Sequence, residues 1–426
     1  MKKVLIIGYF WPYRGGSGRM LGLAKYFSGF GWQPTILTAP LETKPSEKFN
    51  YVETSYPGDI FSFWRKIFKF MKFEGKKSIT EQLKSKIGVE SQDSFIDWLR
   101  TKYQEIFAFP DTEKKWYKPA LVTARKLLKK EKFDAIISVW PVISHLIAKR
   151  LKEEYQIPWV ADFPDPWSEN HAYPYGKIRK FFDRKLETKT IASADVITAA
   201  SPGYAKKEEI LHQRPAIVIT HGFDPENIPK EKIPLTKKFT LTYTGTIYPQ
   251  KQDPTKLFLA IKELIEQKEI DSREIEVRFY GDKQSWLDLE IQKYGLKNIA
   301  IQYGRVPKGE SIKKQCESQT LLLLCWEDKK EIGVYPLKIF EYLISQRPIL
   351  ATGGSENEDI KKIIEETKSG VSAVTIEGIK DCLKIFYQEY KRIGATSYYG
   401  DFKKIEEYSY RSMAKKFAKV LNQIIK

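Results

Sequence analysis

Three segments of the sequence combine glycine or proline with single charged side chains, a combination that suits the binding of phosphate groups. The most informative contains Gly333, which frees the backbone, and Pro336, which suits the first turn of a helix. Backbone N–H groups near Pro336, Leu337 and Lys338 would form an anion site, and Glu341 could accept hydrogen bonds from two ribose hydroxyls. The alternative is an amphipathic core helix that carries an exposed glutamate.

A second segment, Tyr243-Thr-Gly-Thr-Ile-Tyr-Pro-Gln-Lys251, joins a predicted strand to a helix that starts near Pro254. Its small residues allow a tight turn, and Lys251 could meet a leaving phosphate. In a chain with so many basic residues, this lysine could equally be a solvated surface residue.

The third segment follows the first predicted strand and contains Gly15, Gly16 and Gly18. Glycines there would let backbone N–H groups approach a phosphate, although a tight connection could need them for geometry alone. The spacing Gly16-x-Gly18-x-x-x-Gly22 does not fit a dinucleotide fingerprint, and the second predicted strand ends without an acid for a ribose. We therefore do not expect NAD.

Metal-binding patterns are missing from the sequence. Three cysteines and four histidines are scattered without metal-ligand spacing. No Asp-x-Asp motif follows a predicted strand, so the sequence offers no magnesium site. We predict that the protein binds no metal. His145 is expected to pack in the interior, and His212 to lie on the surface.

Short apolar runs alternate with stretches of helical spacing along most of the chain, a pattern typical of parallel sheets covered by helices. Strands are predicted at 3–8, 33–38, 135–139, 158–162, 196–199 and 217–220, and again at 240–244, 276–281, 299–304, 321–325 and 349–351. The chain is therefore predicted to be an α/β protein with two doubly wound domains.

The length of 426 residues exceeds what one hydrophobic core usually fills. A polar stretch rich in proline indicates a linker at 225–236, so the first domain spans 1–224 and the second spans 237–404. The alternation stops between about 41 and 118, which indicates an insertion in the first domain. An amphipathic helix at about 405–426 is expected to pack back on the first domain.

The chain carries 72 Lys and Arg residues against 54 Asp and Glu residues, a formal charge of +18, so an anionic partner is expected. Within the insertion, Trp64 and Phe68 share a broad helical face, with Arg65 and Lys69 beside them. This pattern is typical of helices that lie on anionic bilayers. The alternative is a basic helix packed on its own domain. Nucleic acid fits less well, because the sequence contains no recognisable DNA- or RNA-binding module.

Taken in order, several short motifs resemble those of GT-B glycosyltransferases, in particular the retaining family 4 type. Besides the glycine loop, they are Ala161-Asp-Phe-Pro-Asp-Pro-Trp167, Ala194-Asp-Val-Ile-Thr198 with Ser201, Thr220-His-Gly-Phe-Asp224, Tyr243-Thr-Gly245, Lys338-Ile-Phe-Glu-Tyr-Leu343 and Pro348-Ile-Leu350. The resemblance covers nearly the whole chain. It implies two Rossmann-like domains that face one another across an interdomain cleft.

The resemblance places the donor nucleotide in the second domain. It implies donor contacts from Gly245, Thr246, Lys251, Gly333, Pro336, Leu337, Lys338 and Glu341, and from Gly15 and Gly16 in the first domain. Lys251 matches the family's phosphate lysine. Two departures affect this site: the family's arginine after the strand-end glycine is Thr246 here, and the glutamate eight residues before Glu341 is Gly333.

The resemblance also concerns the reacting sugar. Many relatives carry a histidine at the end of the strand that here leads into Ala161-Asp-Phe-Pro-Asp-Pro-Trp167. In this chain Asp162 or Asp165 is the candidate catalytic residue there, together with Lys251 on the donor side. An aspartate in such a proline-rich turn could instead order the turn or cap the next helix.

We therefore predict a retaining, metal-independent, hexosyltransferase-like enzyme. It would transfer a sugar from a nucleoside-diphosphate sugar to a saccharide or polyprenyl-linked acceptor in cell-surface polysaccharide assembly, without a cofactor. We expect it in the cytoplasm, peripheral on the inner membrane face, and not bound to nucleic acid. The alternatives are a nucleotide-sugar epimerase or hydrolase of the same fold, which acts without an acceptor, and a catalytically silent partner subunit, which binds no nucleotide.

Overall fold

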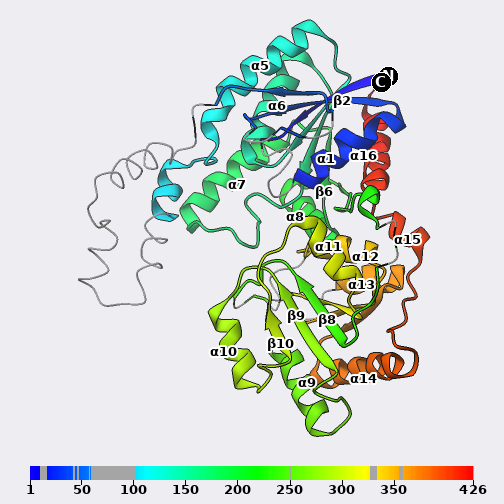
Figure 1. Cartoon of the computed structure of the whole chain (residues 1–426). Coiled ribbons are helices and arrows are strands. Elements are labelled where there is room, and N and C mark those ends of the chain that lie inside the picture. Colours follow the sequence, from blue (N-terminus) through cyan, green and yellow to red (C-terminus); the bar gives the residue numbers. More distant parts are fainter. Residues whose placement is uncertain are drawn as a thin grey trace, which may run out of the picture. The chain divides into compact units, whose positions relative to one another are not determined.

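The computed structural model describes residues 1–9, 17–41, 44–45, 48–56, 58, 101–229, 231, 233–249, 251–326, 333–354 and 358–425. The chain divides into two compact units. Unit 1 comprises Met1–Ala200, Tyr204–Ile219 and Ala414–Lys426, and unit 2 comprises Ser201–Gly203 and Thr220–Met413. Each unit is built on one parallel sheet with helices packed against it (Figure 1).

Unit 1 contains a seven-stranded parallel sheet in the order β3-β2-β1-β4-β5-β6-β7. Its strands are β1 (Lys2–Ile7), β2 (Trp32–Thr38), β3 (Tyr51–Glu53), β4 (Ala135–Val139), β5 (Trp159–Phe163), β6 (Val196–Ala199) and β7 (Ala216–Val218). The inner strands β4 and β5 are buried along their whole length, which explains their mainly apolar sequences.

The helices of unit 1 connect these strands and cover the sheet. They are α1 (Ser17–Tyr26), α5 (Tyr117–Lys130), α6 (Val142–Tyr155), α7 (Lys177–Ile191) and α8 (Pro202–His212), with short turns η1 (Phe27–Phe30) and η2 (Lys114–Trp116). Residues 101–107 are also helical. The last helix, α16 (Tyr410–Ile424), returns to this unit, because the Phe417 ring centre lies 5.3 Å from the guanidinium carbon of Arg19 on α1.

Unit 2 contains a six-stranded parallel sheet in the order β10-β9-β8-β11-β12-β13. Its strands are β8 (Phe239–Thr244), β9 (Ile275–Tyr280), β10 (Ala300–Gln302), β11 (Thr320–Leu324), β12 (Ile349–Thr352) and β13 (Gly370–Ala373). Its helices are η3 (Pro225–Asn227), α9 (Thr255–Glu266), α10 (Ser285–Lys293), α11 (Lys308–Cys316), α12 (Lys338–Ile344), α13 (Glu358–Thr367), α14 (Ile376–Ile393) and α15 (Phe402–Glu406).

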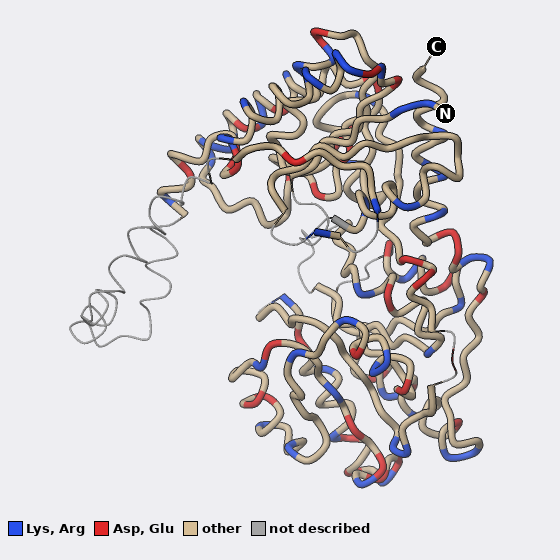
Figure 2. Tube along the Cα trace, turned by 45° about the horizontal axis from the view of Figure 1, so that its top comes forward, with Lys and Arg blue, Asp and Glu red and all other residues tan. Residues whose placement is uncertain are grey.

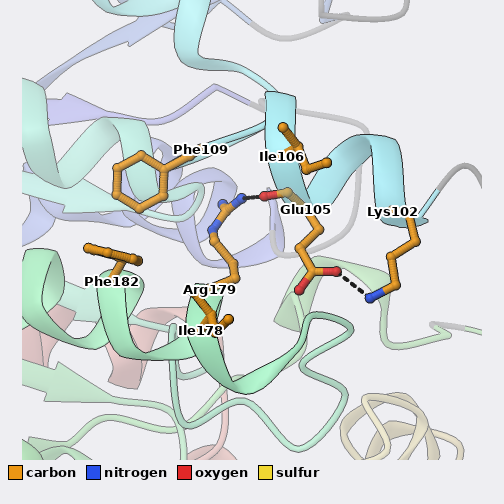
Figure 3. Close-up of a pocket in the computed structure, with 7 residues that line it drawn as sticks. All are labelled: Lys102, Glu105, Ile106, Phe109, Ile178, Arg179 and Phe182. Atoms are coloured by element: carbon orange, nitrogen blue, oxygen red, sulfur yellow. Dashed lines mark hydrogen bonds and ion pairs between the residues drawn. The ribbon is translucent and has the colours of Figure 1, made fainter.

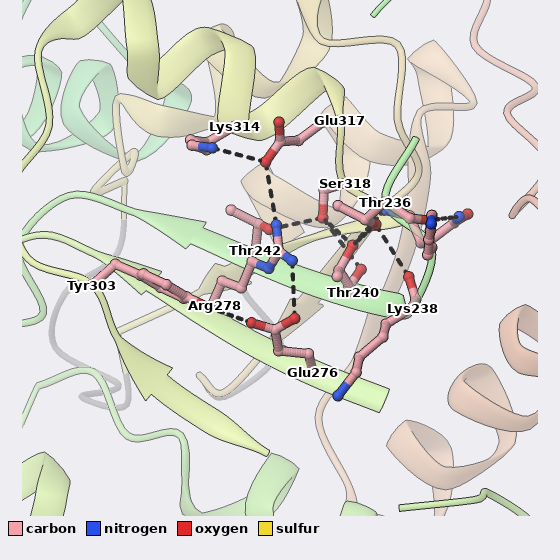
Figure 4. Close-up of polar contacts among 12 residues, drawn as sticks. Thr236, Lys238, Thr240, Thr242, Glu276, Arg278, Tyr303, Lys314, Glu317 and Ser318 are labelled. Atoms are coloured by element: carbon pink, nitrogen blue, oxygen red, sulfur yellow. Dashed lines mark hydrogen bonds and ion pairs between the residues drawn. The ribbon is translucent and has the colours of Figure 1, made fainter. Parts of the chain in front are cut away.

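Alternate residues of β8 point to opposite sides of the sheet. The odd-numbered side chains join the core that α9 and α14 complete. The even-numbered Thr240 and Thr242 belong to a polar cluster (Figure 4), in which Ser318 Oγ donates to Thr242 Oγ1 at 2.8 Å. The hydroxyls of Thr236 and Thr240 lie 2.7 Å apart. Because Thr236 precedes the strand, this cluster fixes the end of the linker to the sheet.

The structure confirms the predicted α/β class with two Rossmann-like sheets. Two short strands, β3 and β13, were not predicted, because they have only three and four residues and no apolar run. β3 pairs in parallel with β2. Part of the range interpreted as an insertion therefore belongs to the sheet of unit 1.

Candidate functional site

In unit 2 the strand order reverses between β8 and β11, the two strands at the centre of the sheet. Ligands of open parallel sheets bind outside the carboxyl ends of the strands at such a reversal. One connection leaves β8 after Thr244 and leads to α9, and Cys325 and Trp326 follow β11. The candidate site is therefore built from these connections and from α12, which contacts the end of β8.

Helix α12 is fixed to the end of β8 by buried polar contacts. The Tyr342 hydroxyl accepts a hydrogen bond from the Thr244 backbone N–H at 3.0 Å. Gln315 Nε2 donates to the Thr244 hydroxyl at 2.9 Å, and the Ser345 hydroxyl donates to Gln315 Oε1 at 2.8 Å. All four residues are buried, so these bonds are protected from water and hold the helix in one position.

Lys338, the first residue of α12, extends over Gly245 at the end of β8. A Cβ atom on Gly245 would lie 2.6 Å from Lys338 Cε, and Gly245 has a φ of +107°, so glycine is required. The Lys338 ammonium group lies 4.8 Å from the centre of the Tyr243 ring and 3.5 Å from the Thr246 carbonyl oxygen. Burial lowers the pKa of Lys338 to about 8, and the charge of Glu341 partly opposes this shift.

Gln252 shapes the turn that carries Lys251. Its buried side chain accepts a hydrogen bond from the Tyr243 hydroxyl at 3.3 Å and donates one to the Leu324 carbonyl oxygen at 2.8 Å. These bonds join the turn after β8 to the end of β11. The Lys251 ammonium group lies 4.4 Å from the centre of the Trp326 ring, so a second lysine is held at the same end of the sheet.

Glu341 lies three residues after Lys338, on the same side of α12. Its side chain is 39% exposed, and Lys308 Nζ lies 3.8 Å from its carboxylate. An exposed ion pair of this length contributes little to stability, so a ligand can replace it at small cost. Beside this helix, the Thr246 hydroxyl donates to the Asp282 carboxylate at 3.4 Å.

The predicted anion-binding stretch before α12 is only partly exposed. Gly333 has a φ of +89°, and its carbonyl oxygen accepts a hydrogen bond from the Ser201 hydroxyl at 2.6 Å. Pro336 is buried, and its carbonyl oxygen accepts a hydrogen bond from the Ile339 N–H at 2.9 Å, whereas Leu337 is exposed. The left-handed backbone at Gly333 favours glycine at this position.

In unit 1, Asp162 on β5 is fully buried. Arg19 donates to its carboxylate from Nε at 2.9 Å and from Nη2 at 2.7 Å, and the Thr198 hydroxyl donates at 2.6 Å. Arg19 also donates to the Ile219 carbonyl oxygen at 2.6 Å. Both oxygens of Asp162 are thus engaged within the protein. Sequence analysis did not single out Arg19, because a charged residue beside a glycine loop is usually solvated.

Asp165 has a different environment from Asp162. Asp165 is exposed, and its carboxylate accepts a hydrogen bond from the Tyr204 hydroxyl at 3.2 Å. His171 Nδ1 lies 3.4 Å from the same hydroxyl. Neighbouring protein atoms displace enough water to raise the pKa of Asp165 above its ordinary value. Asp162 is enclosed within β5, whereas Asp165, just after the strand, is exposed.

Glu187 of α7 and Glu208 and His212 of α8 bring their ligand atoms within 4.8 Å of one another. The His212 side chain is buried, so the prediction that it lies on the surface is wrong, whereas His145 is buried as predicted. His212 Nε2 lies 3.1 Å from a Glu208 oxygen, and Glu187 accepts a hydrogen bond from the Ser168 N–H at 2.9 Å. Burial raises the pKa of both glutamates to about 8.

No known protein family matches the sequence, and no curated protein matches it. Solved structures do match. Sucrose-phosphate synthase from Thermosynechococcus elongatus is 11% identical over 99% of both chains, with a TM-score of 0.59. WaaG, a glycosyltransferase involved in lipopolysaccharide biosynthesis, is 12% identical over 98% of this chain and 99% of its own, with a TM-score of 0.56. The trehalose-6-phosphate structure from E. coli bound with UDP-2-fluoro glucose is 13% identical over 100% of both chains, with a TM-score of 0.57. This chain has the GT-B fold.

The GT-B fold that the sequence motifs predicted is thereby confirmed. Within its second sheet, the structure brings Gly245, Thr246 and Lys338 into contact, and it places Lys251 on the adjoining turn and Glu341 on the same helix as Lys338. The role of the Gln252 side chain was not predicted, because no neighbouring residue in the sequence indicates its bond to β11.

Several predicted residues lie outside the described residues. They are Gly15 and Gly16 of the glycine loop and Trp64, Arg65, Phe68 and Lys69 of the predicted membrane segment. Their roles stay predictions.

Proposed function

We propose that this chain is a retaining glycosyltransferase. It would move a sugar from a nucleoside-diphosphate sugar to a saccharide or lipid-linked saccharide acceptor in cell-surface polysaccharide assembly. The observation that carries the proposal is the pair of lysines, Lys251 and Lys338, at the carboxyl end of the second GT-B sheet. A nucleoside diphosphate carries its charge on two adjacent phosphates, which two positioned ammonium groups suit. One structure with this fold contains UDP-2-fluoro glucose, and another is a glycosyltransferase of lipopolysaccharide biosynthesis.

The family that the sequence resembles carries an arginine at the position of Thr246. In this chain Lys338 can supply the positive charge of that arginine. Its ammonium group lies beside Gly245 and reaches the Thr246 carbonyl oxygen at 3.5 Å. In this chain a cation next to the strand-end glycine therefore comes from α12 instead of from the turn after β8. We assign Lys338 and Lys251 to the diphosphate, and we assign the half-exposed Glu341 to the ribose hydroxyls.

Transfer requires stabilisation of the leaving diphosphate as its bond to the anomeric carbon breaks. Aromatic rings already hold both lysines before any reaction, so little reorganisation is needed when negative charge develops. Two ammonium groups can balance the two negative charges of the donor's diphosphate, which supports metal-independent transfer.

The reacting sugar is expected to meet a polar group of unit 1. Asp165 is exposed and shares the Tyr204 hydroxyl with His171, whereas Asp162 is enclosed by Arg19. We therefore assign Asp165 to the reacting sugar and give Asp162 a positioning role.

Nucleotide binding tests the donor site directly. UDP, GDP, ADP and CMP are compared by thermal shift and then by calorimetry, because a ligand that binds only the folded chain raises its melting temperature. We expect one nucleoside diphosphate to bind, and Lys338→Met to abolish most of this binding. Lys293→Met is the matched control, since Lys293 is an exposed lysine of α10 in the same unit. Failure of all four nucleotides to bind would refute the proposal and favour the silent partner subunit.

Acceptor dependence separates a transferase from other enzymes with this fold. A transferase consumes donor rapidly only when a saccharide or polyprenyl-linked acceptor is supplied, whereas an epimerase or hydrolase acts on the donor alone. The anomeric configuration of the product, measured by NMR, tests retention. An unchanged rate in the presence of EDTA is expected for metal-independent transfer.

A further inference from the structure

Large apolar side chains are exposed on two neighbouring segments of unit 1. One segment is the helical stretch 101–107 with the residues that follow it, and the other is the first half of α7. The side chains, which we name the apolar patch, are those of Ile106, Phe107, Phe109, Ile178, Phe181 and Phe182, and they are 37–78% exposed.

The two segments of the apolar patch enclose an open hollow of about 540 Å³ (Figure 3). Ile106 and Phe109 line it from one segment, and Ile178 and Phe182 line it from α7. The hollow brings these four apolar side chains together, and the centre of the Phe181 ring lies 5.6 Å from that of the Phe182 ring beside it. Continuous apolar surface of this kind marks an interaction site.

Arg179 of α7 locks the two segments together beneath the patch. Its guanidinium group donates to the carbonyl oxygens of Glu105 at 2.6 Å, Ala108 at 3.2 Å and Pro110 at 3.2 Å. It also donates to the Asp183 carboxylate at 2.8 Å, and it is buried. These charge-assisted bonds give the patch a fixed base, so its exposure does not arise from a loosely attached segment.

The charge around the patch is basic. Helix α7 contains six basic and two acidic residues, and both acids, Asp183 and Glu187, are buried. Lys177, Lys185 and Lys189 are exposed on the same helix. Helices α5 and α16 also contain basic residues and no acidic ones, so positively charged helices recur in this protein, and α7 is the one that also carries the apolar patch (Figure 2).

We propose that the apolar patch and the exposed lysines of α7 dock unit 1 on an anionic phospholipid bilayer. The phenylalanines and isoleucines would enter the boundary between headgroups and acyl chains, and the lysines would contact lipid phosphates. None of the described helices combines the length and apolar character required to traverse a bilayer, so the contact is interfacial. The inference rests on the proposed function in one respect: a lipid-linked acceptor lies at such a surface.

The basic and aromatic segment predicted at 60–77 leads along the chain toward the patch, which begins just after residue 100. Two segments that contain several aromatic side chains therefore follow one another in the sequence. An apolar protein partner would explain the phenylalanines but not the exposed lysines of α7. For this reason we favour the bilayer.

Co-sedimentation of the full chain with vesicles tests the proposal. We expect the chain to bind vesicles of phosphatidylglycerol and phosphatidylcholine, to bind phosphatidylcholine vesicles weakly, and to be released by salt. Phe181→Ser with Phe182→Ser should lower the bound fraction roughly tenfold or more, because two aromatic side chains no longer enter the lipid. Leu289→Ser with Phe402→Ser is the matched control, since both residues are exposed apolar residues of unit 2.

Lys185→Glu with Lys189→Glu is a second variant that leaves the apolar side chains in place. These two lysines are chosen because Lys180 and Arg184 pair with Glu169. The charge reversal should also weaken binding to anionic vesicles roughly tenfold or more, without lowering the melting temperature. Phe181→Ser with Phe182→Ser could destabilise the protein, and in that case the result for Lys185→Glu with Lys189→Glu decides. If that charge-reversed protein still binds anionic vesicles as well as the parent does, the proposal is overturned.

Three further results would overturn the proposal. The first is a parent chain that does not bind anionic vesicles, and the second is a serine variant that binds them as well as the parent. The third is self-association of the chain through the patch. It would be measured as a dimer in analytical ultracentrifugation, and Phe181→Ser with Phe182→Ser would abolish this dimer. Nucleotide affinity is measured on the same samples by calorimetry, so a failure of the donor site is recognised separately from a failure of membrane docking.

Discussion

Lys338 combines a charge with partial burial, and this combination makes its ionisation sensitive to a ligand. Its position over the Tyr243 ring and beside Gly245 lowers its pKa to about 8, within reach of neutral pH. A diphosphate next to the ammonium group would favour the charged form and raise this pKa again. Nucleotide binding is therefore expected to take up a proton near pH 8.

We predict that nucleotide affinity falls as pH rises through about 8, because the free protein loses the Lys338 proton there. Lys338→Arg keeps its positive charge at these pH values and should remove most of the fall. Calorimetry on both sides of this pH, in buffers of different ionisation enthalpy, measures affinity and proton uptake together. An equal pH dependence in the arginine variant would rule out Lys338 as the titrating group.

Stability provides an independent check on Lys338. Between pH 8 and 10.5 the unfolded chain holds the lysine proton more tightly than the folded chain, so stability rises with pH across this window. Below pH 8 the buried charge destabilises the fold by its full amount. Lys338→Met should therefore leave the melting temperature at pH 7 unchanged or higher while nucleotide binding is lost. A lower melting temperature would mean that Lys338 has a structural role.

Glu341 can be tested at the same scale. We predict that Glu341→Ala weakens nucleotide binding by roughly 1.5–3 kcal/mol, because the ribose loses charged hydrogen-bond partners. The melting temperature should stay the same, since Ile339, Phe340 and Leu343 hold α12 in the core. Glu310→Ala, which removes an exposed glutamate from α11, is the matched control for calorimetry. If both variants bind the nucleotide equally well, Glu341 does not contact the ribose.

At the scale of elements, the Arg19–Asp162 pair joins α1 to β5, and Thr198 adds β6 to the same contact. α1 follows the glycine loop in the chain, and this pair fixes α1 to the sheet. Asp162 therefore holds α1 against β5.

We predict opposite outcomes for the two aspartates of the β5 turn. Asp162→Asn leaves Arg19 as a buried charge without a charged partner and should lower the free energy of unfolding by about 3–5 kcal/mol. Asp165→Asn changes an exposed residue and should alter stability by about 0.5 kcal/mol or less, while turnover falls. Urea unfolding and donor consumption, measured on both variants, distinguish the roles. Normal turnover by Asp165→Asn would remove Asp165 from the reaction.

Some of the strands could be predicted from the sequence and others could not. β4 and β6 were predicted with the bounds that the structure has, because a strand inside a parallel sheet shows an apolar run between polar ends. β3 and β13 lack such a run, and the elements after β12 were largely missed. The contact of Lys338 with Gly245 joins residues 93 positions apart, so no local pattern could indicate it.

At the scale of the whole molecule, each sheet places its first strand third in the order and reverses the strand order beside it. Strand and helix alternation alone therefore offers two equivalent positions for a ligand. The side chains break this equivalence. In unit 2 the reversal at β8 and β11 carries two lysines over aromatic rings, and Glu341 lies on the adjoining helix.

Hydrogen–deuterium exchange tests which unit holds the nucleotide. We predict that a bound nucleoside diphosphate slows exchange in peptides covering 243–252 and α12, because ligand binding suppresses the local openings that expose these amides. Peptides from β5 and α7 should exchange at unchanged rates, since they belong to unit 1. Glu341→Ala at the same nucleotide concentration should show less protection, which ties the effect to the proposed site. Protection confined to unit 1 would place the nucleotide on the other sheet and refute the assignment of both lysines.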